Sequence, residues 1–160
     1  MVYWLSLSFS SKGVYELAKK TALFICRCGT NIASVVDIEE LVDRFSKRED
    51  LVVVEDLHLC GDEGLRKIEE VLRGQEVDRV VVAGCTDRLH GELFKSVVER
   101  AGLNPGFLKI ANIREQCSWV HWMDSERATE KAASLIEMAL EAVKHSSETR
   151  KAKVPVVRRV

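Results

Sequence analysis

The chain has 160 residues, of which 46% are hydrophobic, and its 24 basic and 25 acidic residues give a formal net charge of −1. This length is enough to bury one hydrophobic core, and the charge balance gives no electrostatic reason to expect nucleic acid or an anionic membrane as a partner. No apolar run approaches the ~20 residues that span a bilayer, so we expect a cytoplasmic domain.

Short apolar runs alternate with amphipathic segments, which is typical of a parallel sheet flanked by helices. After an expected N-terminal arm over residues 1–20, the pattern predicts four strands, at 21–26, 51–55, 78–84 and 106–111. Helical spacing of apolar residues predicts a helix after each strand, and the last and longest begins near Asp124 or Ser125, either of which can cap it.

Strands joined by single helices make right-handed crossovers and therefore lie parallel. The expected architecture is a three-layer, flavodoxin-like α/β fold with a four-stranded, mainly parallel sheet and a long C-terminal helix. We expect this domain to span residues 21–145. The polar and basic segment 146–160 is expected to be a tail or linker.

Every cysteine in the chain lies at or after the end of an expected strand. Cys26 and Cys28 come at the end of the first strand, Cys60 after the second, Cys85 after the third, and Cys117 a few residues past the fourth. Open parallel sheets bind ligands beyond the carboxyl ends of their strands, so all five cysteines are expected at the functional edge. Cysteines that act only as small core hydrophobes would rarely all fall there.

Thiolates from separate loops suit a soft metal centre, either structural Zn²⁺ or an iron–sulfur cluster. Cys₄ zinc sites usually use two close Cys-x-x-Cys pairs, which this chain lacks, whereas a cubane cluster is wider and accepts ligands from several loops. A third interpretation is a thiol–disulfide enzyme or sensor that uses Cys26 and Cys28, one of them activated by Arg27 or a helix terminus. A fourth is a metal-free assembly domain whose cysteines stay reduced. The spacing favours the cluster over zinc.

Several motifs have unusual composition. They are Cys26–Ile32 (CRCGTNI), Cys85-Thr86, Ala101–Pro105 (AGLNP) and above all Ala111–His121 (ANIREQCSWVH). In these motifs the chain, from about residue 21 to about residue 144, resembles the N-terminal domain of the A-type subunit of heterodisulfide reductase. Members of that family are iron–sulfur flavoproteins of methanogens, sulfate reducers and related anaerobes.

The resemblance implies an electron-transfer module of an oxidoreductase complex linked to methanogenesis, with no substrate turnover by the module alone. It implies one [4Fe–4S] cluster, flavoprotein or ferredoxin-like subunits as partners, and FAD only on a partner or on a domain outside this chain. Carried over to this sequence, the cluster ligands come from Cys26 or Cys28, with Cys28 favoured, and from Cys60, Cys85 and Cys117.

Five further residues near the cysteine loops are expected to contact the cofactor: Gly29, Asn31, Arg114, Trp119 and His121. Gly29 and Asn31 give the backbone freedom for a close approach to a ligand. Arg114 can neutralise the negative charge of a cluster, Trp119 can shield it from water, and His121 can tune it by hydrogen bonding. The ordinary alternative is a local salt bridge for Arg114, packing against the last helix for Trp119, and a position as a plain surface histidine for His121.

Overall fold

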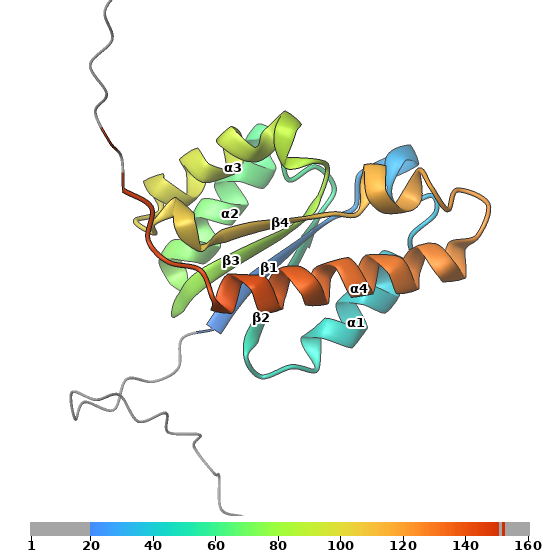
Figure 1. Cartoon of the computed structure of the whole chain (residues 1–160), viewed down its shortest axis with the longest axis horizontal. Helices are drawn as coiled ribbons and strands as arrows, with labels where there is room; N and C mark the ends of the chain where they lie inside the picture. Colours follow the sequence, from blue (N-terminus) through green and yellow to red (C-terminus); the bar gives the residue numbers. More distant parts are fainter. Residues whose placement is uncertain (1–19, 151, 153–160) are drawn as a thin grey trace, which may run out of the picture.

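The computed structural model describes residues 20–150 and 152, which form a four-stranded sheet between two layers of helices (Figure 1). The strands are β1 (Lys20–Cys26), β2 (Leu51–Asp56), β3 (Val77–Gly84) and β4 (Leu108–Asn112). The helices are α1 (Ile38–Ser46), α2 (Asp62–Gly74), α3 (Asp87–Arg100) and α4 (Ser125–Lys144). The predicted three-layer α/β fold is confirmed.

All strand pairs in the sheet are parallel, and the strand order is β2-β1-β3-β4. This is the order of the first four strands in flavodoxin-like folds, in which the order reverses next to β1. Helices α1 and α4 cover one face of the sheet, and α2 and α3 cover the other (Figure 1). The central strands are therefore buried on both faces, which explains their nearly continuous apolar sequences.

Side-chain caps determine where two of the helices begin. The carboxylate of Asp37 accepts a hydrogen bond from the backbone N–H of Glu40 (2.9 Å) and starts α1. The carboxylate of Asp124 accepts one from the backbone N–H of Arg127 (3.0 Å) and starts α4. Of the two caps predicted for the last helix, Asp124 is the one used.

The structure differs from the prediction at both ends of β4. Pro105–Phe107 form a 3₁₀ turn, η2, which the side chain of Asn104 caps by accepting from the N–H of Gly106 (2.9 Å), so β4 begins two residues later than predicted. After β4, Arg114–Ser118 form a π-helical turn, η3. Hydrophobic periodicity does not reveal such single turns, because they are too short for a sequence pattern to repeat.

Most of the expected arm, residues 1–19, lies outside the described residues, as do residue 151 and residues 153–160 of the expected tail. The first part of the tail crosses η2, where the Asn104 amide bonds to Thr149. Its Oδ1 accepts from the Thr149 N–H (2.9 Å), and its Nδ2 donates to the Thr149 carbonyl (3.0 Å). In the part of the chain that the structure describes, no helix is long and apolar enough to cross a membrane.

We expect Gly106→Ala to lower the free energy of unfolding by about 1–3 kcal/mol, the usual cost of overpacking. A Cβ at Gly106 would overlap the carbonyl oxygen of Ser147 and lie 2.8 Å from the backbone nitrogen of Thr149. Urea unfolding monitored by circular dichroism measures the change. Gly74→Ala is the control, since a Cβ at Gly74 meets no atom within 4 Å. Equal stability of the two variants would contradict the prediction.

Candidate metal centre

Four cysteines lie at the carboxyl edge of the sheet, on the loops that follow β1, β2 and β3. Cys26 is the last residue of β1, Cys28 precedes the 3₁₀ turn η1 (Gly29–Asn31), Cys60 lies just before α2, and Cys85 follows β3 directly. Parallel pairing brings the strand ends together: Cys26 pairs with Asp56, and a Cβ built on Gly84 would lie 3.5 Å from the Cys26 Cβ. These three loops therefore meet at one place.

The electrostatics of the two buried cysteines link them to the other thiols of this edge. Burial raises the pKa of the Cys26 thiol, and negative charge on Cys28 and Cys60 would raise it further. Burial also raises the pKa of Cys85 to about 11; the charge of Arg114 opposes this rise, and charge on Cys26 and Cys28 adds to it. Because such effects act at short range, we treat Cys26, Cys28, Cys60 and Cys85 as one unit, the thiol group.

The thiol group has a buried side and a side open to solvent. Cys26 and Cys85 are buried at the ends of the two central strands, with 4% and 7% of their surface exposed. Cys28 and Cys60 are half-buried. Burial keeps the inner thiols protonated at neutral pH, so binding a metal here would have to release protons. The half-buried pair leaves a route by which a ligand can reach the inner thiols.

Cys117 belongs to different surroundings. It lies on η3, is completely buried, and its Sγ donates to the carbonyl oxygen of Ala128 in α4 (3.0 Å). Burial raises its pKa to about 11, and this rise is opposed by the charge of Lys131 and by a backbone hydrogen bond from Ala132, both on α4. The structure therefore turns the Cys117 thiol toward α4 and does not bring it into the thiol group.

The η3 turn is nevertheless part of the site, because it bonds to two of the cysteine loops. The hydroxyl of Ser118 donates to the carbonyl oxygen of Asn31 in η1 (2.5 Å), and the two turns lie side by side in Figure 1. The carboxylate of Glu115 accepts from the backbone N–H of Thr86, the residue after Cys85 (3.1 Å). Neither Ser118 nor Glu115 was singled out from the sequence, although both belong to the Ala111–His121 motif.

The residues predicted to contact a cofactor have different surroundings. A Cβ at Gly29 would meet nothing within 4 Å, so the surface there is open. The backbone carbonyl of Asn31 accepts the hydrogen bond from the Ser118 hydroxyl. Trp119 is 53% exposed, with the guanidinium of Arg114 5.0 Å from its ring centroid. His121 is half-buried after η3, and its backbone N–H donates to the carbonyl of Cys117 (3.0 Å).

Arg27, the residue expected to activate a neighbouring thiol, is engaged elsewhere. Its guanidinium binds Glu39 (2.6 Å) and Glu55 (2.8 Å), and these bonds raise the pKa of the arginine. The pKa of Cys26 is raised by burial, whereas nucleophilic cysteines have a lowered pKa. The geometry thus gives no support to Cys26 as the attacking thiol of a disulfide-exchange enzyme.

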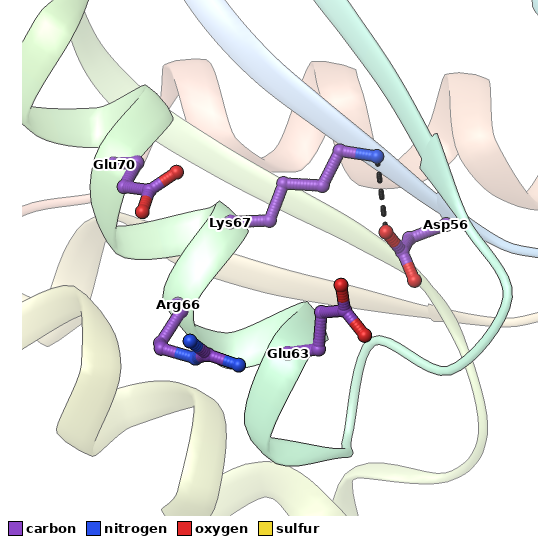
Figure 2. A pocket seen from close by; sticks show the side chains of 5 residues that line it. All are labelled: Asp56, Glu63, Arg66, Lys67 and Glu70. Carbon is purple, nitrogen blue, oxygen red and sulfur yellow. Dashed lines mark hydrogen bonds and ion pairs between the residues drawn. The ribbon is translucent and has the colours of Figure 1, made fainter.

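A shallow pocket of ≈ 350 Å³ lies beside the carboxyl end of β2, lined by Asp56 and four residues of α2: Glu63, Arg66, Lys67 and Glu70 (Figure 2). Lys67 extends across it, and its Nζ binds the Asp56 carboxylate (3.0 Å) and the Glu55 carbonyl (2.9 Å). The lining is charged throughout and contains no thiol. None of its lining residues belongs to the thiol group, and the ion pair that the structure shows among them is the one between Lys67 and Asp56.

The fold and the site together define a flavodoxin-like α/β domain with neighbouring cysteines at the ligand-binding edge of its sheet. The sequence identifies the domain further: it is homologous to part of the A-type subunit of heterodisulfide reductase, which confirms the resemblance inferred from its motifs. No protein-family model matches the chain.

Three relatives illustrate the extent of this similarity. The chain is 44% identical over 122 residues to the A-type subunit of the ferredoxin/F(420)H(2)-dependent CoB-CoM heterodisulfide reductase of Methanosarcina acetivorans. The matched residues make up 76% of this chain and 15% of that protein. It is 44% identical over 126 residues to the second A-type iron-sulfur subunit of CoB–CoM heterodisulfide reductase from Methanopyrus kandleri, a match that covers 78% of this chain and 19% of that protein. It is 42% identical over 130 residues to the A-type iron-sulfur subunit from Methanocaldococcus jannaschii, a match that covers 80% of this chain and 20% of that protein. The chain therefore spans a fifth or less of the length of these relatives.

Proposed function

We propose that this domain is an electron-transfer module that binds one [4Fe–4S] cluster at the thiol group and relays electrons to a flavin or ferredoxin-like partner. The observation that carries the proposal is the convergence of four cysteines from three loops at the edge where parallel sheets bind ligands. The names of the relatives from Methanopyrus kandleri and Methanocaldococcus jannaschii, which describe iron–sulfur subunits, also support it.

The chemistry of the thiol group fits such a cluster. Cysteine thiolates are the usual ligands of iron–sulfur clusters, and a [4Fe–4S] cluster takes four of them. The guanidinium of Arg114 lies beside Cys85 and Cys28 and supplies positive charge to a site that would hold several negative ones. Among the described residues, no group of three or more His, Cys, Asp or Glu side chains is close enough together to hold a single metal ion.

We propose Cys26, Cys28, Cys60 and Cys85 as the four ligands. Cys117, which its position after the fourth strand and the resemblance both made a candidate, would have to give up its hydrogen bond to Ala128 and turn away from α4 to join them. The half-buried position of Cys28 agrees with its place as the favoured ligand of the Cys26–Cys28 pair. In this proposal Cys26 is a ligand as well.

Bound at this edge, the cluster would accept and release single electrons. The chain's own residues would bind it and limit its contact with water. The inner thiols, Cys26 and Cys85, sit on the ends of buried strands, so they exclude water from one side. The η3 turn would also limit access of water, because Ser118 and Glu115 attach it to the loops of Cys28 and Cys85.

We propose a flavoprotein or ferredoxin-like subunit of a heterodisulfide reductase-type complex as the partner. The relatives are each named as one lettered subunit of a reductase, which implies an assembly of several chains. An exposed apolar segment follows η3: Trp119, Val120, Trp122 and Met123. Contiguous apolar side chains on a surface are typical of contacts with other proteins, and we propose that the partner binds here. FAD would belong to the partner or to a domain outside this chain. The cytoplasmic location remains a prediction.

Anaerobic reconstitution of the full chain with iron and sulfide tests the proposed function. We expect about four iron and four sulfide ions per chain, a brown protein, and an electron paramagnetic resonance signal after reduction. Elemental analysis with a parallel zinc assay separates the alternatives, since a structural zinc site would retain one zinc per chain. A colourless protein without iron after reconstitution would show that the proposal is wrong.

A further inference from the structure

The side chain of Arg114 is fixed in place beside the thiol group. Its Nη2 donates to Oε1 of Glu115 (2.7 Å), and the ring of Trp119 lies 5.0 Å from its guanidinium carbon. The other oxygen of Glu115 accepts from the N–H of Thr86 (3.1 Å). The guanidinium is thus tied to the loop that carries Cys85, and only 14% of the side chain is exposed.

The Nε donor of this guanidinium is buried without a hydrogen-bond partner in the part of the chain that the structure describes. Buried N–H groups in proteins almost always have an acceptor, and the guanidinium cannot lose its proton to avoid the cost. The nearby groups that would carry negative charge include Cys85 and Cys28, whose attraction adds to the raised pKa of Arg114.

We propose that Arg114 is a positioning residue of the metal centre whose Nε–H donates a hydrogen bond to a sulfur atom of the bound cluster or of its cysteine ligands. This inference rests on the proposed function. Glu115 and Trp119 hold the guanidinium through Nη2 and its face, which leaves Nε free for the sulfur. Trp119 therefore acts by stacking on Arg114.

This arrangement has a redox consequence. Uptake of one electron from a low-potential reductant adds one negative charge to the cluster and requires no proton. A fixed cation and an N–H donor at the sulfur atoms stabilise the more negative, reduced state, so they raise the reduction potential. Removal of Arg114 is therefore expected to lower the potential without changing the number of ligands.

The test uses the full chain, reconstituted without oxygen and titrated with dithionite under electron paramagnetic resonance detection. In Arg114→Gln we expect the equilibrium constant for reduction to fall at least tenfold, which is about 59 mV for a one-electron couple. Arg114→Lys keeps the charge but lacks the Nε–H, and we expect a smaller fall. Arg73→Gln is the control: it removes an exposed charge at the far end of α2 and should leave the potential unchanged.

The iron content distinguishes failure of this inference from failure of the proposed function. An unmodified protein that binds no iron contradicts both. An Arg114→Gln variant that binds the full complement of iron at the unmodified potential overturns only the role of Arg114. If Arg114→Gln does not retain iron, Arg114→Lys provides the test. A reduction potential of Arg114→Lys equal to that of the unmodified protein would overturn the hydrogen bond from Nε.

Discussion

Cys60→Ser and Cys85→Ser variants are expected to lose most of their iron, whereas Cys117→Ser is expected to retain it. Cys60 and Cys85 belong to the thiol group, and a serine hydroxyl is a poor ligand for a soft centre that uses thiolate sulfur. Cys117 faces α4, where its Sγ donates to the Ala128 carbonyl, and a serine hydroxyl can make the same hydrogen bond. Iron per chain after anaerobic reconstitution measures the difference, with circular dichroism to confirm that each variant is folded.

The same series decides between two ligand sets. The motifs favour Cys28, Cys60, Cys85 and Cys117, whereas the thiol group of the structure contains Cys26 in place of Cys117. Loss of iron in Cys26→Ser together with its retention in Cys117→Ser supports the structural set. The reverse result would show that the Cys117 thiol leaves α4 when the cluster binds.

Gly64→Ala is expected to have the second-largest effect, although Gly64 carries no functional group. A Cβ at this position in the first turn of α2 would overlap the carbonyl oxygen of His58 and lie 2.6 Å from the Cα of Leu59. These are backbone atoms of the loop that carries Cys60, and Leu59 is 1% exposed. The loop cannot yield by a side-chain rotation, so the whole segment must move and take Cys60 with it.

We expect Gly64→Ala to lower the free energy of unfolding of the metal-free protein by about 1–3 kcal/mol and to lower iron retention against a chelator. Urea unfolding and a chelator competition assay measure the two effects. Gly74→Ala is the matched control on the same helix, because a Cβ there meets nothing within 4 Å. If the two variants retain iron equally well, then the position of Cys60 does not depend on this close contact.

The strands, the helices and the edge at which the cysteines gather were all predictable from the sequence. Hydrophobic periodicity is a local property, and β1 and β3 are so thoroughly buried that their apolar runs are almost continuous. The relationship to heterodisulfide reductase was also predictable, because the Ala111–His121 motif has the unusual composition that carried the resemblance. The same motif marked Arg114 and Trp119, although it gave no indication of how they contact each other.

Only the tertiary structure decided which way the functional side chains face. The π-helical turn η3 aims the Cys117 thiol at α4, and the Arg27 guanidinium binds Glu39 and Glu55, which are 12 and 28 residues further along the chain. The importance of Gly64 also emerges only from the loop packed against it. Element boundaries depend on neighbours in sequence, but the direction of a side chain depends on contacts between residues far apart, and the sequence pattern does not contain those contacts.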